Sequence, residues 1–248
     1  MKFGAIIEAR MNSSRLSGKV ILKIKGIPTL ILLIDRLKEV NKLDKIVVAT
    51  TTSEKDDKLC EILIKNNINF FRGSERNVLE RVLNTARKFK ISNIVQITGD
   101  CPLIDPEIIS QNILTYEKNR FDYVSNSNIR SYPDGMDVAI FSKNSLEKTY
   151  KQTNNKYDLE HVTLYFRRNP NLFSLCNIVS PQNLFFPELG LTLDEKEDFF
   201  LIKKIFNKFW KRRRNFSCLE VVNYLNKNKN IKKINSKIIR KKTPFISK

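Results

Sequence analysis

In the first half of the chain, short apolar runs alternate with longer segments of mixed apolar and polar residues. Short apolar runs, often β-branched, predict strands buried on both faces of a sheet; they are FGAIIE at 3–8, KIVVAT at 45–50, INFF at 68–71 and NIVQIT at 93–98. Longer segments between or after them predict helices; they span 29–39, 54–66 and 75–89, and another starts at Asp105-Pro106-Glu107. A strand–helix alternation of this kind predicts a parallel α/β sheet.

Beyond residue 118 the pattern changes, and short strands mix with helices. The predicted strands are 123–126, 136–141, 172–178 and 189–193, and the predicted helices lie near 142–151, 158–168, 195–210 and 216–226. There is no internal repeat and no flexible linker between two halves. We therefore predict one α/β domain with a mixed central sheet flanked by helices. We place this domain at 1–228 and a basic C-terminal tail at 229–248.

Charge is distributed unevenly along the chain. The sequence has 45 Lys and Arg against 26 Asp and Glu, a net charge of +19, which alone indicates a nucleic-acid or membrane-surface partner. Residues 203–248 hold 16 basic residues and one acid, whereas residues 1–202 hold 29 basic and 25 acidic residues. The charge therefore belongs to a basic C-terminal helical extension, and a base-composition bias in the coding DNA explains it equally well. We expect that a chain truncated at about residue 228 keeps the activity of the main domain.

Other features favour a cytoplasmic protein. The longest apolar run, ending in LILLI at 30–34, is interrupted by charge and falls short of the roughly 18 residues that a membrane span needs. The apolar stretch at the amino terminus is too short for a signal peptide. The four cysteines lie far apart with no CxxC pair, which argues against a zinc site and a disulfide framework. The single histidine, His161, removes any catalysis that needs two imidazoles.

The loop after the first predicted strand carries a cluster of cations. ARMNSSRLSGK at 9–19 combines Arg10, Arg15 and Lys19 with Ser14 and other small polar residues. Fixed cations beside hydroxyl and backbone donors at the carboxyl end of a strand can hold a triphosphate. The segment is neither a GxxxxGK[ST] nor a GxGxxG loop. A solvated basic turn is the alternative interpretation.

Two carboxylates follow predicted strands and are candidates for a metal site. Asp100 comes directly after 93–98, beside Gly99, and Asp194 comes directly after 189–193. Mg²⁺ takes one or two protein carboxylates and completes its coordination with phosphate oxygens and water. Adjacent strands of one sheet can bring both carboxylates together. The alternative is that each aspartate caps a helix.

Four segments carry a resemblance to a known family; they are ARMNSSRLSGK at 9–19, RGSERNVLERV at 72–82, YPDGMDVAIFS at 132–142 and DLEHVTLYF at 158–166. In order and spacing they resemble the SpsF-like cytidylyltransferases, which are related to the CMP-Kdo and CMP-sialic acid synthetases. The resemblance covers residue 3 to about 202. The chain departs from the family pattern at Ser17, where proline is usual, and at Glu8, where a neutral residue is usual.

The resemblance implies a Rossmann-like nucleotidyltransferase fold of the GT-A-like type. It implies transfer of CMP from CTP to an acidic sugar or a related small acid, with release of pyrophosphate, in surface polysaccharide biosynthesis. It implies Mg²⁺ on Asp100 and Asp194, catalytic contacts from Arg10, Arg15, Lys19 and Asp100, and a homodimer. The nucleotide-binding residues are expected to be Ala9, Arg10, Ser14, Arg15, Lys19, Ser74, Asn77 and Asp100. Asp137 and His161 are the candidates for acceptor binding, with a structural turn and a structural histidine as the alternatives.

Two other functions compete with this interpretation. A GT-A-type glycosyltransferase would share the fold, but its usual DxD motif is absent, since Asp134 and Asp137 have DxxD spacing. A basic nucleic-acid-binding protein would explain the C-terminal charge, but it leaves the 9–19 loop and Asp100 without a role. A catalytically weakened relative is a third alternative, which the departures at Glu8 and Ser17 keep open.

Overall fold

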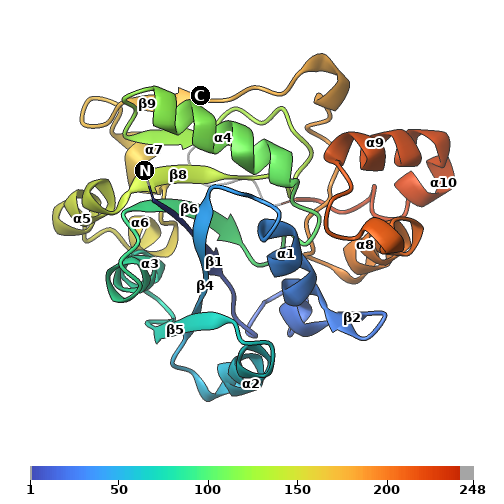
Figure 1. Ribbon diagram of the computed structural model, residues 1–248, viewed down its shortest axis with the longest axis horizontal. Helices are drawn as coiled ribbons and strands as arrows, with labels where there is room; N and C mark the ends of the chain where they lie inside the picture. Colours follow the sequence, from blue (N-terminus) through green and yellow to red (C-terminus); the bar gives the residue numbers. More distant parts are fainter. Residues whose placement is uncertain (1, 241–248) are drawn as a thin grey trace.

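A seven-stranded sheet forms the centre of the computed structural model, which describes residues 2–240 (Figure 1). Its strands lie in the order β5-β4-β1-β6-β8-β7-β9. Their bounds are β1 Phe3–Glu8, β4 Leu43–Thr51, β5 Asn69–Gly73, β6 Asn93–Thr98, β7 Tyr123–Ser125, β8 Ala139–Ser142 and β9 Leu175–Asn177. A separate antiparallel pair consists of β2 (Lys23–Ile24) and β3 (Ile27–Pro28).

The first half of the sheet is parallel, as the apolar runs predict. β1 lies between β4 and β6 and pairs in parallel with both, so that Ile6 is opposite Val47 and Gln96. β5 continues the parallel arrangement beside β4. β8 runs antiparallel to both β6 and β7, and β9 is parallel to β7. The predicted α/β fold with a mixed central sheet is confirmed. The carboxyl ends of β1, β4 and β6 meet at one edge of the sheet.

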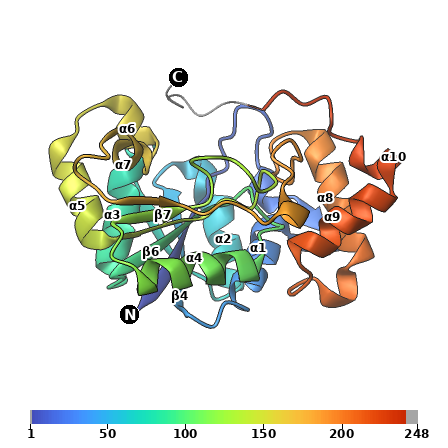
Figure 2. The same ribbon diagram turned by 90° about the horizontal axis from the view of Figure 1, so that it is seen from above.

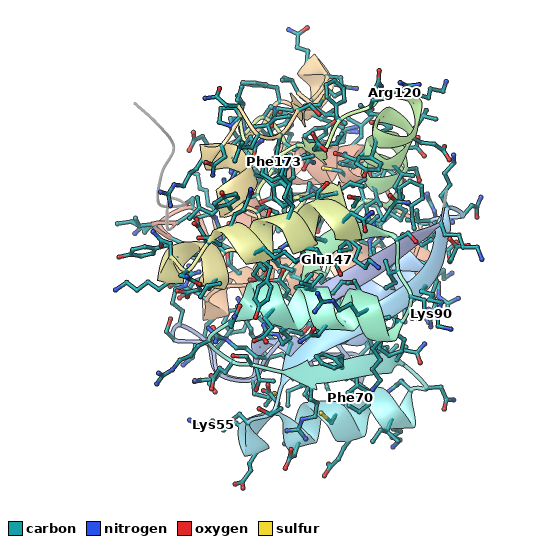
Figure 3. The ribbon with its side chains drawn as sticks, turned by 90° about the vertical axis from the view of Figure 1, so that its left-hand side faces the viewer. Lys55, Phe70, Lys90, Arg120, Glu147 and Phe173 are labelled. Carbon is teal, nitrogen blue, oxygen red and sulfur yellow. The ribbon has the colours of Figure 1, made fainter. Side chains whose placement is uncertain are left out.

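Helices cover both faces of the sheet. Those before residue 170 are α1 Thr29–Leu37, α2 Asp57–Lys65, α3 Val78–Lys88, α4 Pro106–Lys118, α5 Lys143–Gln152, α6 Lys156–Glu160 and α7 Leu164–Arg168. The apolar side chains of α1, α2 and α4 enter one core, and those of α3, α5 and α7 enter the other. Figure 3 shows α5 above α3, with Glu147 between them, and Phe70 of β5 next to α2. Glu147 accepts from Arg87 of α3 at 3.1 Å.

The C-terminal helices form a group at the end of the molecule opposite α5, α6 and α7 (Figure 2). They are α8 Lys196–Lys208, α9 Cys218–Lys227 and α10 Lys229–Lys232. In the described part of the predicted tail, residues 229–240, Ile231 and Ile234 contact the apolar core. Residues 241–248 of that tail lie outside the described residues. Within residues 2–240, none of the helices has the length and apolar character needed to cross a membrane.

One buried arginine ties these C-terminal helices to the sheet domain. Arg36 on α1 is fully buried, and its guanidinium donates to the carbonyls of Ile104 at 2.8 Å, Arg213 at 3.1 Å and Phe216 at 2.7 Å. The same group lies 4.0 Å from the centre of the Phe216 ring. Burial lowers the pKa of Arg36 to about 10. The group stays charged at neutral pH and joins three segments that are far apart in sequence.

We expect Arg36→Met to lower the free energy of unfolding by about 3 kcal/mol, because it leaves two buried carbonyls and a partly buried one without a donor. Urea unfolding followed by circular dichroism measures this change. Arg87→Met is the matched control, since Arg87 is exposed and bonds at the surface to Glu147. A loss for Arg36→Met no larger than that of the control would contradict the assignment.

Two predicted elements differ in the structure. Residues 189–193 are not a strand, because their backbone partners are two loops: Leu191 N donates to Asp134 O at 2.6 Å and Leu193 N to Asp100 O at 2.7 Å. The predicted helix at 158–168 is divided into α6 and α7. His161 leaves the helical region, with φ −111° and ψ 89°, and the buried Val162 then enters the core.

Candidate active site

A cleft of about 380 Å³ opens at the sheet edge where β1 and β6 end. Of the residues predicted for the site, the cleft is lined by Ala9, Arg10, Ser14, Arg15, Lys19, Asp100 and His161. β1 delivers the 9–19 loop, and β6 delivers Gly99 and Asp100. Gly99 N donates to Glu8 O at 2.8 Å, and a Cβ on Gly99 would lie 2.9 Å from that of Ala9. Glycine is therefore required at this position, where the loops that follow β1 and β6 lie side by side.

The 9–19 loop is held in one shape by two anchors. Asp56, which is buried, accepts from Met11 N at 2.7 Å and also from the hydroxyls of Thr50 and Thr51. At the other end Gly18 has φ +68°, a left-handed conformation that favours glycine, and its N donates to Met11 O at 2.9 Å. The cations of this loop are consequently presented from a fixed backbone.

Lys19 and the two predicted metal-binding aspartates come together at one point. Lys19 Nζ lies 2.8 Å from Asp100 Oδ2 and 2.9 Å from Asp194 Oδ1. Burial alone would lower the pKa of Lys19, but the two carboxylates outweigh it and hold that pKa above its ordinary value. Burial likewise acts to raise the pKa of Asp100, and Lys19 outweighs it, so the pKa of Asp100 lies below its ordinary value. Lys19 and Asp100 therefore both carry their charges at neutral pH.

Arg15 joins this cluster, whereas Arg10 stands apart from it. Arg15 Nη2 lies 2.8 Å from Asp194 Oδ1. Arg10 is exposed and lies 3.7 Å from Glu75, at the outer part of the cleft. The structure therefore brings two of the three predicted loop cations onto the acidic pair.

Asp194 reaches Asp100 because residues 189–193 run alongside the loop after β6. Leu193 N and the Thr192 hydroxyl both donate to the carbonyl of Asp100. Gly135, at φ +103°, lies so close to residues 191 and 192 that a Cβ would be 2.7 Å from their backbone. Glycine in the YPDGMD segment thus allows this close approach.

Neither aspartate caps a helix, which removes the structural alternative. The N-cap of α4 is Asp105, whose side chain accepts from Glu107 N, and the N-cap of α8 is Glu195. The two carboxylates of Asp100 and Asp194 instead converge on one positive charge. Two hard oxygen donors at one point suit Mg²⁺ that also binds phosphate oxygens. Residues 2–240 contain no group of three or more His, Cys, Asp or Glu suited to a metal.

Four other predicted residues lie elsewhere or in a different setting. Ser74 and Asn77 do not line the cleft: Ser74 Oγ accepts from Asn77 N, and Asn77 caps α3 by accepting from Glu80 N. Asp137 also lies outside the cleft lining and forms a two-point ion pair with Arg130, at 3.1 and 2.9 Å. His161, between α6 and α7, does face the cleft.

Charged residues to which the sequence assigns no role also line the cleft, among them Glu8 and Arg81. Glu8 is half-buried at the end of β1, and Arg81 is buried on α3. Burial raises the pKa of Glu8, an effect that its bond from Gln96 and the charge of Arg81 only partly offset. Arg81 Nε is buried and has no hydrogen-bond partner. The departure from the family pattern at Glu8 was the only signal for this pair.

Comparison with known proteins agrees with this geometry. A family model described as cytidylyltransferase matches residues 4–238. The chain belongs to the cytidylyltransferase family. It is therefore an enzyme of the nucleotidyltransferase class that uses CTP, and the family match continues past residue 228 into the segment predicted as a tail.

Relatives of this cytidylyltransferase match almost the whole chain. It is 39% identical over 241 residues to the uncharacterized protein MJ1063 of Methanocaldococcus jannaschii, with 97% of each chain covered. It is 34% identical over 229 residues to the spore coat polysaccharide biosynthesis protein SpsF of Bacillus subtilis, covering 90% of this chain and 93% of SpsF. The predicted resemblance to SpsF is confirmed.

Two further comparisons bear on the fold and on the sugar-acid relatives. The structure of a cytidylyltransferase from Leptospira borgpetersenii superposes with a TM-score of 0.89 at 32% identity, covering 97% of this chain and 100% of that one. The nucleotidyltransferase fold is thereby confirmed. The 3-deoxy-manno-octulosonate cytidylyltransferase of Desulfosudis oleivorans is 28% identical over 182 residues, 70% of this chain and 66% of its own.

Proposed function

We propose that this cytidylyltransferase transfers CMP from CTP to an oxygen of an acidic sugar or a related small acid and releases pyrophosphate. One observation carries the proposal: Lys19, on the loop that follows β1, lines the cleft together with Asp100 and contacts both Asp100 and Asp194. The cationic side chains that can bind phosphate are thus in direct contact with the carboxylates that can bind a divalent cation.

In the proposed reaction the acceptor oxygen attacks the α-phosphorus of CTP and the bond to the pyrophosphate oxygen breaks. Arg15 and Lys19 bind phosphate oxygens and stabilise the charge that develops on the leaving pyrophosphate. Asp100 and Asp194 would hold Mg²⁺, which would neutralise phosphate oxygens and lower the pKa of an acceptor hydroxyl. No side chain needs to act as a covalent nucleophile, because positioning and charge stabilisation account for catalysis of phosphoryl-type transfer.

The proposed acceptor class rests on the names of the relatives and on a residue that lines the cleft. SpsF is named for spore coat polysaccharide biosynthesis, and the Desulfosudis oleivorans relative is named for 3-deoxy-manno-octulosonate. His161 lines the same cleft as the 9–19 loop, and we propose that it contacts such an acid. We propose a role in surface polysaccharide biosynthesis in the cytoplasm, where the four free cysteines would stay reduced. Homodimer formation stays a prediction.

Release of pyrophosphate tests the proposal. The full chain is incubated with Mg²⁺, each of the four ribonucleoside triphosphates, and a panel of acidic sugars and phosphorylated polyols. We expect pyrophosphate and a CMP-linked product with CTP and at least one acidic sugar. Turnover only with phosphorylated polyols would move the acceptor class, and transfer of a sugar from a nucleotide sugar would replace the proposal with the glycosyltransferase alternative.

The cleft also provides candidates for contacts to the base. A carboxylate accepts from the exocyclic amine of cytosine, whereas uracil presents a carbonyl at that position. Glu8 and the unpartnered Arg81 Nε offer an acceptor and a donor on the same side of the cleft. Of the pair expected from sequence, Asn77 Oδ1 caps α3 and Ser74 Oγ accepts from the backbone N of Asn77.

We expect Glu8→Gln to reduce the preference for CTP over UTP by about tenfold, the lower part of the 1–3 kcal/mol that one base contact provides. A glutamine can donate to the uracil carbonyl as well as accept from cytosine, so discrimination falls more than turnover with CTP. The ratio of kcat/KM for the two nucleotides measures it. Glu61→Gln, an exposed change on α2, is the control, and an unchanged ratio in Glu8→Gln refutes the base contact.

A further inference from the structure

The segment after α10 carries basic residues that the proposed reaction does not use. Within residues 233–240 Lys233 and Lys237 are exposed, as solvated charges are. Asn235 and Arg240 differ from them, because Asn235 is buried and Arg240 is mostly covered. Both side chains turn toward the acidic loops beside the cleft, so they belong to a different environment from the rest of the segment.

Asp198 is the point at which these two side chains meet the active site. Its carboxylate, on the first turn of α8, is fully buried. Oδ2 accepts from the backbone N of Asp194 and of Glu195, both at 3.0 Å. Oδ1 accepts from Asn235 Nδ2 at 2.7 Å and from Arg240 Nη2 at 2.8 Å. One carboxylate thus links the C-terminal segment to the backbone of Asp194.

Arg240 provides the charge that this buried carboxylate requires. Among the described residues it is the only cation within 4 Å of Asp198. A buried carboxylate without a partner cation is strongly destabilising. Arg240 also lies 3.5 Å from Asp134 and 3.9 Å from Asp194, and its Nη1 is buried without a hydrogen-bond partner. The guanidinium therefore lies among three acids that come from two segments, Asp134 from one and Asp194 and Asp198 from the segment at the start of α8.

Gly190 makes room for this guanidinium. A Cβ at that position would lie 1.7 Å from Arg240 Nη2, so any larger residue displaces the arginine. The carbonyl of Gly190 also accepts from Asn235 Nδ2 at 2.9 Å. Residues 189–193 and the C-terminal segment are therefore fitted to each other in shape as well as in charge.

We propose that Arg240 and Asn235 are positioning residues of the active site, which hold Asp198 so that Asp198 fixes the backbone of the metal-binding Asp194. The inference rests on the proposed function only in taking Asp194 as a metal-binding residue. It assigns a structural task to part of the basic C-terminal segment. It also reverses the expectation that a chain cut at residue 228 keeps its turnover.

Binding of Mn²⁺ in the presence of CTP tests this inference without any acceptor. We expect Arg240→Met to weaken Mn²⁺ binding, followed by electron paramagnetic resonance, by about 10–100-fold, the usual effect of removing a group that orients a metal-binding residue. Arg240→Lys should recover part of the loss, because it restores the charge. Lys237→Ala, an exposed change in the same segment, should bind Mn²⁺ like the wild type.

Gly190→Ala reaches the same contact from the other side without removing a charge. Its methyl group displaces Arg240, and the residue has no left-handed backbone that alanine would strain. We expect the same weakening of Mn²⁺ binding in Gly190→Ala, and its melting temperature will show that this variant is folded. The test also applies if Arg240→Met does not fold. Wild-type Mn²⁺ affinity in folded Gly190→Ala overturns the inference. If the variants lose Mn²⁺ binding but the wild-type protein transfers CMP to no acid, the proposed acceptor class is wrong and this inference stands.

Discussion

Asp100→Asn should lower kcat for CMP transfer by about two to three powers of ten, while the protein stays folded. Asparagine keeps the shape of the side chain and removes the charge that faces Lys19 and the position for Mg²⁺. Because the pKa of Asp100 lies below its ordinary value, wild-type Asp100 is ionised at neutral pH and the substitution removes a full charge. Pyrophosphate release at saturating CTP and acceptor measures the effect.

Two accompanying results separate this charge effect from a general disturbance. Asp57→Asn, on the surface of α2, should leave kcat within a few-fold of the wild type. Raising the Mg²⁺ concentration should recover part of the Asp100→Asn activity, since the variant has a weaker metal site and not a damaged cleft. If Asp100→Asn itself turns over within a few-fold of the wild type, the assignment of Asp100 to the metal is wrong.

The parts of the molecule that sequence predicts well are those in which local pattern and burial agree. β1 and β6 have the bounds that their apolar runs predict, because strands in the middle of a parallel sheet need apolar residues on both faces. The site at their carboxyl ends follows from the sheet topology, so a cluster of Lys19 with Asp100 could be expected before any coordinates. Asp194 is a candidate in the sequence because it follows the apolar run 189–193, although that run does not form a strand in the structure.

What sequence missed depends on contacts between distant segments. Residues 189–193 read as a strand by composition, but their partners are the loops around Asp100 and Asp134, which no local pattern shows. Arg240 appears in a lysine-rich run, and only the space left by Gly190 gives it a specific place. Ser74 and Asn77 look like ligands for a base and are spaced as helix caps, three residues before the amides that they bind.

Lys19→Met should change two properties in opposite directions. Turnover should fall by about two to three powers of ten, because the phosphates of CTP lose a fixed cation close to the reacting centre. Binding of Mn²⁺ to the nucleotide-free protein should become stronger, because the methionine no longer neutralises the acidic pair that Lys19 Nζ bridges at 2.8 and 2.9 Å. Electron paramagnetic resonance measures the second effect without CTP, and Lys23→Met, an exposed change on β2, is the control.

The direction of the metal effect decides what Lys19 does in the free enzyme. A lysine that only binds phosphate would leave Mn²⁺ affinity without nucleotide unchanged when it is removed. A lysine that occupies the charge position between Asp100 and Asp194 competes with the metal until the phosphates of CTP draw it away. Stronger Mn²⁺ binding in Lys19→Met therefore means that metal and nucleotide enter together, with Lys19 exchanging carboxylates for phosphate. Unchanged or weaker binding means that the carboxylate pair takes its metal independently of this lysine.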